Sequence, residues 1–266
     1  KLNHASLIDA VRLSRADSYR YPHGDVQALS RLLATTKARR KMIVTDAIFS
    51  MDGDIAPLAQ LYRLAQEHDA WLVIDDAHGF GVLGAHGARS AAHCGLPPSP
   101  RVVYIGTLGK AAGVSGAFVA GGSTVIDALV QTSRSYIFTT ASSPAIACAV
   151  SQSLALIAAG DDRRAHLQAL IARLRSRLAP VCLQAGWTLA PSATPIQPVI
   201  VGGNDAAVSL AQQLFERGFW VPAIRPPTVP AGQARLRISL SAAHTEAQID
   251  ALVAALAEIV AQEAQR

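Results

Sequence analysis

WLVIDDAHG, residues 71–79, begins as a short run of bulky apolar residues and ends in two aspartates, a histidine and a glycine. Such a run predicts a buried strand of the kind found in parallel sheets. In open α/β sheets, ligands bind beyond the carboxyl ends of these strands. The stretch therefore predicts an α/β fold with polar site residues at the end of one strand, although Asp caps of a turn and an ordinary interface histidine would look the same.

Similar segments flank this strand on both sides. MIVTDAIF (42–49) and VVYIG (102–106) read as further buried strands, and GAFVA (116–120) follows a glycine-bearing loop. Residues 57–68 have the pattern of a crossover helix between the first two strands. This alternation predicts α/β layering with a largely parallel sheet.

A second, smaller α+β unit is expected after two long helical patterns at 145–159 and 163–185. We therefore predict a large domain over residues 1–160 and a small domain over 161–266. The expected elements of the small domain are a strand at 198–202, a helix at 206–217, a strand at 235–240 and a last helix from Thr245.

Composition excludes several classes of protein. The chain has 266 residues, 50% of them hydrophobic, but charges, Gly or Pro interrupt every apolar run before the roughly 18 residues of a membrane span. The basic residues behind the net charge of +5 are scattered, which does not favour nucleic acid. Three distant cysteines suggest a reducing cytoplasm rather than a disulfide framework. Because the chain opens at Lys1 without Met, we expect it to be a fragment.

GTLGK (106–110) is the second notable motif, since it places Lys110 among small residues just after a strand. A nucleotide-binding phosphate loop is excluded because Tyr104 stands where its first glycine is required and Ala111 where it needs a hydroxyl. A solvated surface lysine remains the simple alternative. His86, His93 and Cys94 lack the compact spacing of metal ligands, so no metal site is predicted.

The two motifs fit one chemistry. Pyridoxal 5'-phosphate (PLP) requires a lysine amine for covalent attachment and a carboxylate that keeps its pyridine nitrogen protonated. Lys110 and Asp75 can supply these groups. The pair favours a PLP site at the carboxyl edge of the predicted sheet.

A family resemblance makes this interpretation specific. The chain resembles the α-oxoamine synthases, PLP-dependent acyltransferases of fold type I (aspartate aminotransferase-like), and the resemblance covers nearly all of it. Later segments resemble the branch of that family that acts in biotin synthesis. The motifs that carry the resemblance are, in order, NHAS (3–6), FSMDGD (49–54), DDAHG (75–79), GTLGK (106–110), IRPPTVP (224–230) and RLRISLSAAH (235–244).

The resemblance implies a role for each cofactor-binding residue. It implies that His4 stacks on the pyridine ring, that Asp75 pairs with the ring nitrogen, and that Ser50 and His78 hydrogen-bond near the ring hydroxyl. Lys110 would be the lysine that carries the cofactor. Without the resemblance, His4 and Ser50 would be ordinary loop or capping residues.

It also implies contacts to phosphate and substrate. Thr107 resembles a phosphate-binding hydroxyl, and Thr140 one that reaches the phosphate of a neighbouring subunit, which implies a homodimer. Arg237 resembles the arginine that grips the amino-acid carboxylate, with Arg225 assisting it. By strand alternation alone, Arg235 and Arg237 would lie on a solvated face.

The implied reaction joins L-alanine to pimeloyl-CoA, or to a pimeloyl carrier-protein thioester, and releases 8-amino-7-oxononanoate, CoA and CO2. The family has an N-terminal segment with a Gly-rich loop near the cofactor phosphate, and we expect this chain to lack it. Two alternatives remain open. One is another α-oxoamine synthase that joins glycine to acetyl-CoA or succinyl-CoA, and the other is a non-catalytic subunit of the same fold.

Overall fold

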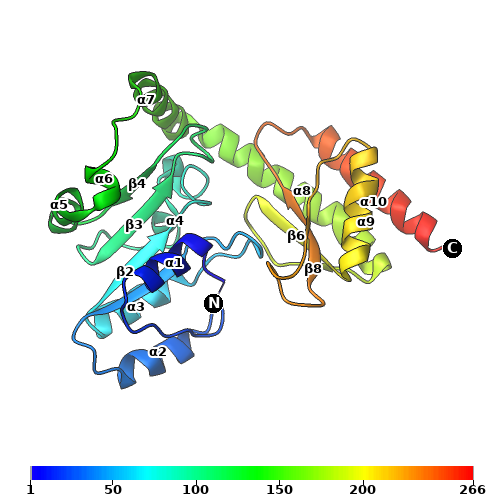
Figure 1. Ribbon diagram of the computed structural model, residues 1–266. Coiled ribbons are helices and arrows are strands. Elements are labelled where there is room, and N and C mark those ends of the chain that lie inside the picture. Colours follow the sequence, from blue (N-terminus) through cyan, green and yellow to red (C-terminus); the bar gives the residue numbers. More distant parts are fainter. Residues whose placement is uncertain (1, 266) are drawn as a thin grey trace. The chain divides into compact units, whose positions relative to one another are not determined.

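The computed structural model describes residues 2–265 (Figure 1). Its contacts separate the chain into two compact units. The first contains the residues up to Phe49 together with Ile55–Asp161, and the second contains Ser50–Asp54 and the residues from Asp162 onward. The short turn Ser50–Asp54 thus groups with the second unit, although in sequence it lies between two elements of the first.

The first unit is built on a four-stranded sheet in the order β1-β2-β3-β4. The first three strands are parallel, as predicted, whereas β4 runs antiparallel to β3. The first strand ends three residues before the predicted end, because Ile48 leaves the sheet and forms an isolated bridge with Ile55. The strands span Lys41–Asp46 (β1), Ala70–Asp75 (β2), Val102–Thr107 (β3) and Ala117–Ala120 (β4).

Helices bury one face of this sheet. The amphipathic helix α3 contributes Leu58, Leu61 and Leu64 to a core that also takes Ile43 of β1 and Leu72 of β2, and burying each such side chain stabilises the fold by about 1.5–3 kcal/mol. Of the described helices in this unit, α3 and α7 were predicted from the sequence and the others were not. The helices are α1 (Ala5–Leu13), α2 (Val26–Thr35), α3 (Leu58–Glu67), the 3-10 turn η1 (Ala85–Gly87), α4 (Ser90–His93), α5 (Ser123–Thr132), α6 (Arg134–Ile137) and α7 (Pro144–Ala159).

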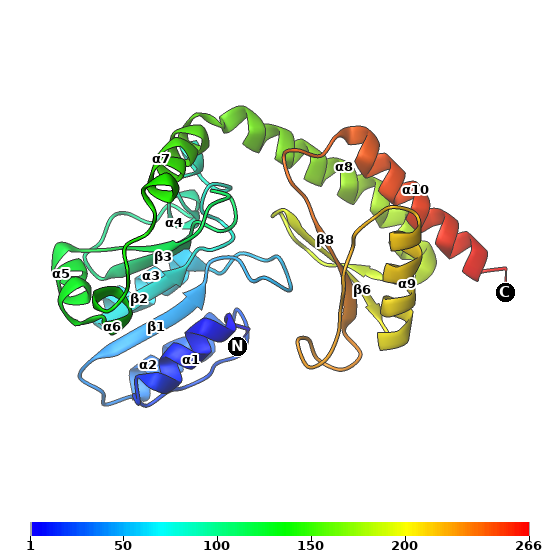
Figure 2. The same cartoon turned by 45° about the horizontal axis from the view of Figure 1, so that its top comes forward.

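The second unit is an antiparallel sheet in the order β5-β6-β8-β7, with its helices gathered on one side (Figure 2). Helix α9 packs on β6, β7 and β8, and α10 packs against α9. The elements are α8 (Asp161–Ala185), β5 (Thr188–Leu189), β6 (Ile196–Gly202), α9 (Asn204–Glu216), β7 (Ala223–Ile224), β8 (Ala234–Ser239) and α10 (Glu246–Glu263).

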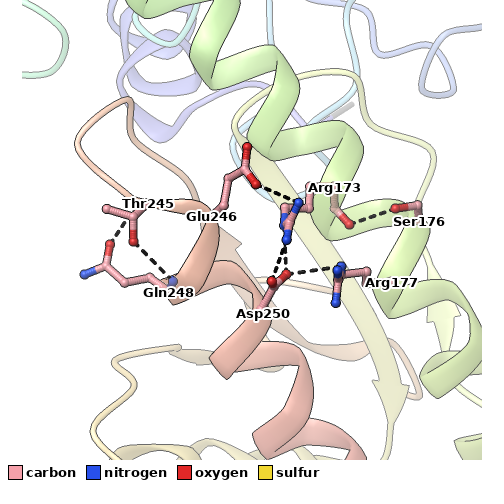
Figure 3. A network of polar contacts seen from close by, with 7 residues as sticks. All are labelled: Arg173, Ser176, Arg177, Thr245, Glu246, Gln248 and Asp250. Carbon is pink, nitrogen blue, oxygen red and sulfur yellow. Dashed lines mark hydrogen bonds and ion pairs between the residues drawn. The ribbon is translucent and has the colours of Figure 1, made fainter.

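A polar network ties the start of α10 to α8 (Figure 3). Arg173 contacts Glu246 at 2.7 Å and Asp250 at 2.6 Å, and Arg177 contacts Asp250 at 3.1 Å. The hydrogen bond from Arg173 lowers the pKa of Asp250. Helix α10 begins with a capping box, in which the Thr245 side chain accepts from the backbone of Gln248 and the Gln248 side chain accepts from the backbone of Thr245. Both features fix where this helix starts.

Within residues 2–265, no single helix is both long and apolar enough to cross a membrane. The bent pair α7 and α8 passes that test only when the two helices are taken together, by length and composition.

Candidate active site

Several predicted site residues gather at the carboxyl edge of the first sheet. Asp46 at the end of β1 is in register with Asp75 at the end of β2, and Asp75 is in register with Ile105 of β3. The parallel strands therefore end side by side, and the turns that follow β2 and β3 carry His78 and Lys110. This edge is where α/β sheets place ligands.

Lys110 and His78 are in direct contact, with Lys110 Nζ 3.0 Å from His78 Nε2. Backbone hydrogen bonds close the loop that carries the lysine: Leu108 N donates to Gly116 O at 2.9 Å, and Val114 N to Leu108 O at 2.8 Å. The lysine is exposed. Its amine is thus accessible, while its backbone is held in one place.

The two adjacent aspartates have different environments. Asp76 is fully buried and accepts hydrogen bonds from both the backbone and the hydroxyl of Ser90. Burial raises the pKa of Asp76 to about 6, against the lowering effect of the Ser90 hydrogen bonds. Asp75 is only half-buried and accepts a hydrogen bond from Ala77 N at 3.0 Å. Asp76 therefore holds the turn in place, whereas the Asp75 carboxylate stays partly accessible.

Gly79 closes this turn at a point where no side chain fits. A Cβ at this position would collide with the Ser90 hydroxyl and with the carboxylate of Asp76. Gly79 N donates to Asp76 O at 3.1 Å, which tightens the turn around His78. The final glycine of the DDAHG motif therefore has a packing role.

Asp76 should impose a specific pH dependence on stability. Its pKa in the folded state, about 6, lies above its ordinary value of 3.8, so the folded state binds the proton more tightly between these values. Relative to an Asp76→Asn variant, the wild type should lose stability as pH rises from about 4 to about 6. Urea unfolding of both proteins at pH 4, 5, 6 and 7 measures this difference, and a difference that does not change with pH would contradict it.

His4 lies at the same edge, at the N-cap of α1. Its backbone N–H donates to both carboxylate oxygens of Asp46, at 3.2 and 3.1 Å. Its ring Nδ1 accepts from Ser6 N at 3.3 Å and lies 2.8 Å from the Ser6 hydroxyl. Asp46 was not singled out from the sequence, although an acid that closes an apolar strand is the same signal that drew attention to Asp75.

The two predicted phosphate-binding threonines differ in their surroundings. Thr107 ends β3, where its hydroxyl accepts from Gly109 N at 3.2 Å and donates to Gly116 O at 3.4 Å. Thr140 is exposed in the loop before α7 and makes no hydrogen bond to any of residues 2–265. Thr107 is therefore part of the loop that carries Lys110. No hydrogen bond within residues 2–265 links Thr140 to that loop.

The remaining predicted site residues belong to the second unit. Arg237 of β8 donates from Nε to Ser50 O at 2.6 Å and from Nη1 to the Ser239 hydroxyl at 3.0 Å. It is half-buried, and desolvation lowers its pKa. Arg225 is exposed directly after β7. Within residues 2–265, no hydrogen bond engages Nη2 of Arg237, so this nitrogen can still bind a carboxylate.

Arg235 does not lie on the solvated face that strand alternation suggested, because it is only 3% exposed. Its Nη1 donates to Asp52 Oδ1 at 2.6 Å and to Met51 O at 3.2 Å. Arg237 donates to Ser50 O in the same turn. Together the two arginines therefore hold the turn Ser50–Asp54 against β8. Sequence alone could not show this, since the turn and the strand are about 180 residues apart.

The same turn is fixed from a second direction. Gly53 O accepts hydrogen bonds from the hydroxyls of Ser192, at 2.8 Å, and Thr194, at 2.9 Å. Gly53 has φ 69°, and an added Cβ would collide with Ile196 O. Only glycine meets both requirements.

Replacing Arg235 by Met should destabilise the protein by about 3 kcal/mol, because it leaves Asp52 without its buried cationic partner. Arg225→Met removes the same charge from an exposed position and should change stability by no more than about 0.5 kcal/mol. Urea unfolding measures the stability of both variants. Equal stability of the two variants would show that the Arg235–Asp52 pair contributes little.

The comparisons with known proteins agree with this geometry. The sequence matches the family model of Aminotransferase class I and II over residues 1–256, and the chain belongs to that family. Two curated relatives are more specific. 8-Amino-7-oxononanoate synthase of Dechloromonas aromatica (strain RCB) is 62% identical, over 97% of this chain and 67% of the relative. The enzyme of the same name from Herminiimonas arsenicoxydans is 61% identical, over 96% of this chain and 66% of the relative. The resemblance inferred from the motifs is thereby confirmed.

Solved structures share the fold. A serine palmitoyltransferase from S. paucimobilis with a bound PLP–myriocin adduct has a TM-score of 0.87 at 28% identity, covering 97% of this chain and 65% of that one. An 8-amino-7-oxononanoate synthase from Francisella tularensis has a TM-score of 0.82 at 31% identity, covering 99% of this chain and 74% of that one. The predicted fold class is confirmed. The chain spans about two thirds of the length of the curated relatives it matches.

Proposed function

We propose that the full-length protein condenses L-alanine with pimeloyl-CoA, or with a pimeloyl carrier-protein thioester, to give 8-amino-7-oxononanoate, CoA and CO2 in biotin synthesis. The observation that carries the proposal is the contact between Lys110 and His78 beside Asp75, at the carboxyl edge of the sheet. The naming of curated relatives at about 60% identity supports the choice of reaction.

The residues at this edge have the donor set that PLP requires, an accessible amine, a carboxylate, an imidazole and a hydroxyl. Lys110 would hold the cofactor covalently, Asp75 would pair with its pyridine nitrogen, and Thr107 would contact its phosphate. His4 and His78 would complete the set at this edge, and the family resemblance also assigns Ser50 a hydrogen bond near the ring hydroxyl. In this proposal, residues 1–160 form the PLP-binding domain and residues 161–266 the small domain.

When bound, PLP supplies an electron sink that allows an amino acid to lose its Cα proton and act as a carbon nucleophile. Once the substrate amine has displaced Lys110 from the cofactor, the freed Lys110 amine would accept that proton, because it is accessible and its loop is closed by hydrogen bonds. His78, 3.0 Å from this amine, would share the proton with it. Arg237 would bind the alanine carboxylate through Nη2, with Arg225 assisting it from the neighbouring loop.

Covalent labelling tests the cofactor assignment. The full-length protein is incubated with PLP, reduced with borohydride, digested and mapped by mass spectrometry. The expected label is a pyridoxyl group on Lys110 alone. A folded protein that takes up no label would overturn the proposal and favour a non-catalytic subunit.

Substrate assays test the reaction itself. We expect release of CoA and formation of 8-amino-7-oxononanoate from alanine and pimeloyl-CoA. Glycine paired with acetyl-CoA or succinyl-CoA should give little product. Preference for one of those pairs would instead assign the protein to another branch of the α-oxoamine synthases.

We also propose that the protein is a homodimer. No side chain of helices α5, α6 and α7 of the first unit is fully buried, although α7 is mostly apolar. Exposed apolar surface on this scale is typical of an interface. The large exposed side chains there are Leu129, Val130, Tyr136, Ile137, Phe138, Leu154 and Leu156. Light scattering of the full-length protein should give twice the mass of one chain, and a monomer would refute this proposal.

The cysteines support a proposal for the location of the protein. Cys94, Cys148 and Cys182 are all free thiols, as is usual in a reducing compartment. We therefore propose that the protein works in the cytoplasm. Fractionation of the source cells tests this, and recovery outside the cytoplasmic fraction would refute it.

A further inference from the structure

The first residues of the chain are tied to the end of β1 by two contacts. His4 N donates to both carboxylate oxygens of Asp46, at 3.2 and 3.1 Å, and Asn3 Nδ2 donates to Val44 O at 2.9 Å. These contacts join residues that are about 40 positions apart in sequence. They fix the point where α1 begins, and with it the backbone from which the His4 imidazole projects.

Asp46 is an unusual residue for a strand end, since it is only 4% exposed. Burial raises its pKa to about 6, and the backbone hydrogen bond from His4 opposes this effect. Asp75, Lys110 and His4 are the charged or titratable groups that act on it. A buried carboxylate is costly unless it is hydrogen-bonded, so the contact to His4 N stabilises both the acid and the start of α1.

We propose that Asp46 is a positioning residue for the cofactor site, which fixes the backbone of His4 and thereby holds the His4 imidazole against the pyridine ring. The inference rests on the proposed function. It assigns Asp46 and Asp75, which are neighbours in register at the same sheet edge, to different tasks. Asp75 acts on the ring nitrogen, and Asp46 acts only through His4.

The test compares Asp46→Ala and Asp46→Asn with a matched control, Ser90→Ala. The control also removes a hydrogen bond at a buried carboxylate, that of Asp76 directly after β2, to which the Ser90 hydroxyl donates, but it does not involve His4. Asp46→Asn keeps the size and one acceptor oxygen, so it covers the case in which the Ala variant does not fold. Hydrogen exchange at the His4 amide, without cofactor, should be faster in both Asp46 variants and unchanged in Ser90→Ala.

PLP titration, followed by the absorbance of the bound cofactor, provides the functional readout. We expect Asp46→Ala to bind PLP roughly tenfold more weakly, as for the loss of one hydrogen bond to a charged group. In a His4→Ala background, the same replacement should have no further effect, because residues that act through each other are not additive. Ser90→Ala should bind PLP like the wild type.

The outcomes separate the two proposals. Wild-type protein that does not bind PLP refutes the proposed function, and the role of Asp46 with it. Wild-type protein that binds PLP, together with Asp46 variants of unchanged affinity, refutes the positioning role alone. Full additivity of the Asp46 and His4 replacements also refutes it, because it would mean that Asp46 does not act through His4.

Discussion

Replacing Lys110 by Ala should abolish formation of 8-amino-7-oxononanoate, with a loss of roughly 10⁴-fold or more, as expected when a positioned acid–base group is removed. The same replacement removes the amine that would carry the cofactor, so the borohydride label should also disappear. Because Lys110 is exposed, its removal should change stability by no more than about 0.5 kcal/mol. CoA release, mass spectrometry of the product and thermal unfolding measure the three effects.

Lys37→Ala is the matched control. Lys37 is also exposed but follows α2, so its removal should leave the label, the activity and the unfolding temperature unchanged. Normal turnover by the Lys110 variant would refute its assignment as the cofactor-bearing lysine. Loss of activity together with unfolding would point to a structural role instead.

Much of the fold could be predicted because its strands carry strong local signals. The apolar runs of β1, β2 and β3 lie close to their predicted positions, since near-continuous apolar runs are typical of strands in parallel sheets. The direction of β4 could not be predicted, because a run of four residues does not say which way it pairs. Helix α1 was not predicted, and only Leu7 of its nine residues is buried.

The candidate site was predictable where the chemistry is concentrated in short motifs. Lys110, His78 and Asp75 each lie at or shortly after a strand end. The motifs and the expected position of a ligand site in this fold therefore indicated the same residues. Asp46 and Arg235 were missed because their burial and partners come from contacts between distant segments. Composition and alternation carry no information about such contacts, and for Arg235 alternation suggested the opposite environment.

Asp75→Asn should reduce turnover by about 10²-fold or more, the usual effect of removing one electrostatic contact to the reacting system. An amide cannot keep the pyridine nitrogen protonated, although it preserves the shape of the side chain and can still accept the hydrogen bond from Ala77 N. Since Asp75 is half-buried, we expect the variant to fold. Steady-state kinetics with alanine and pimeloyl-CoA, and the absorbance of the bound cofactor, measure the effect.

The neighbouring acid provides the sharpest control, because Asp76→Asn makes the same chemical change one residue away. Asp76 faces Ser90 in the interior, so this variant should change stability and its pH dependence while retaining most of its turnover. If both replacements lowered turnover equally, the motif would act as one electrostatic unit. Loss of turnover only in the Asp76 variant would reverse the assignment, whereas loss only in the Asp75 variant would place the chemistry on the acid that the fold leaves accessible.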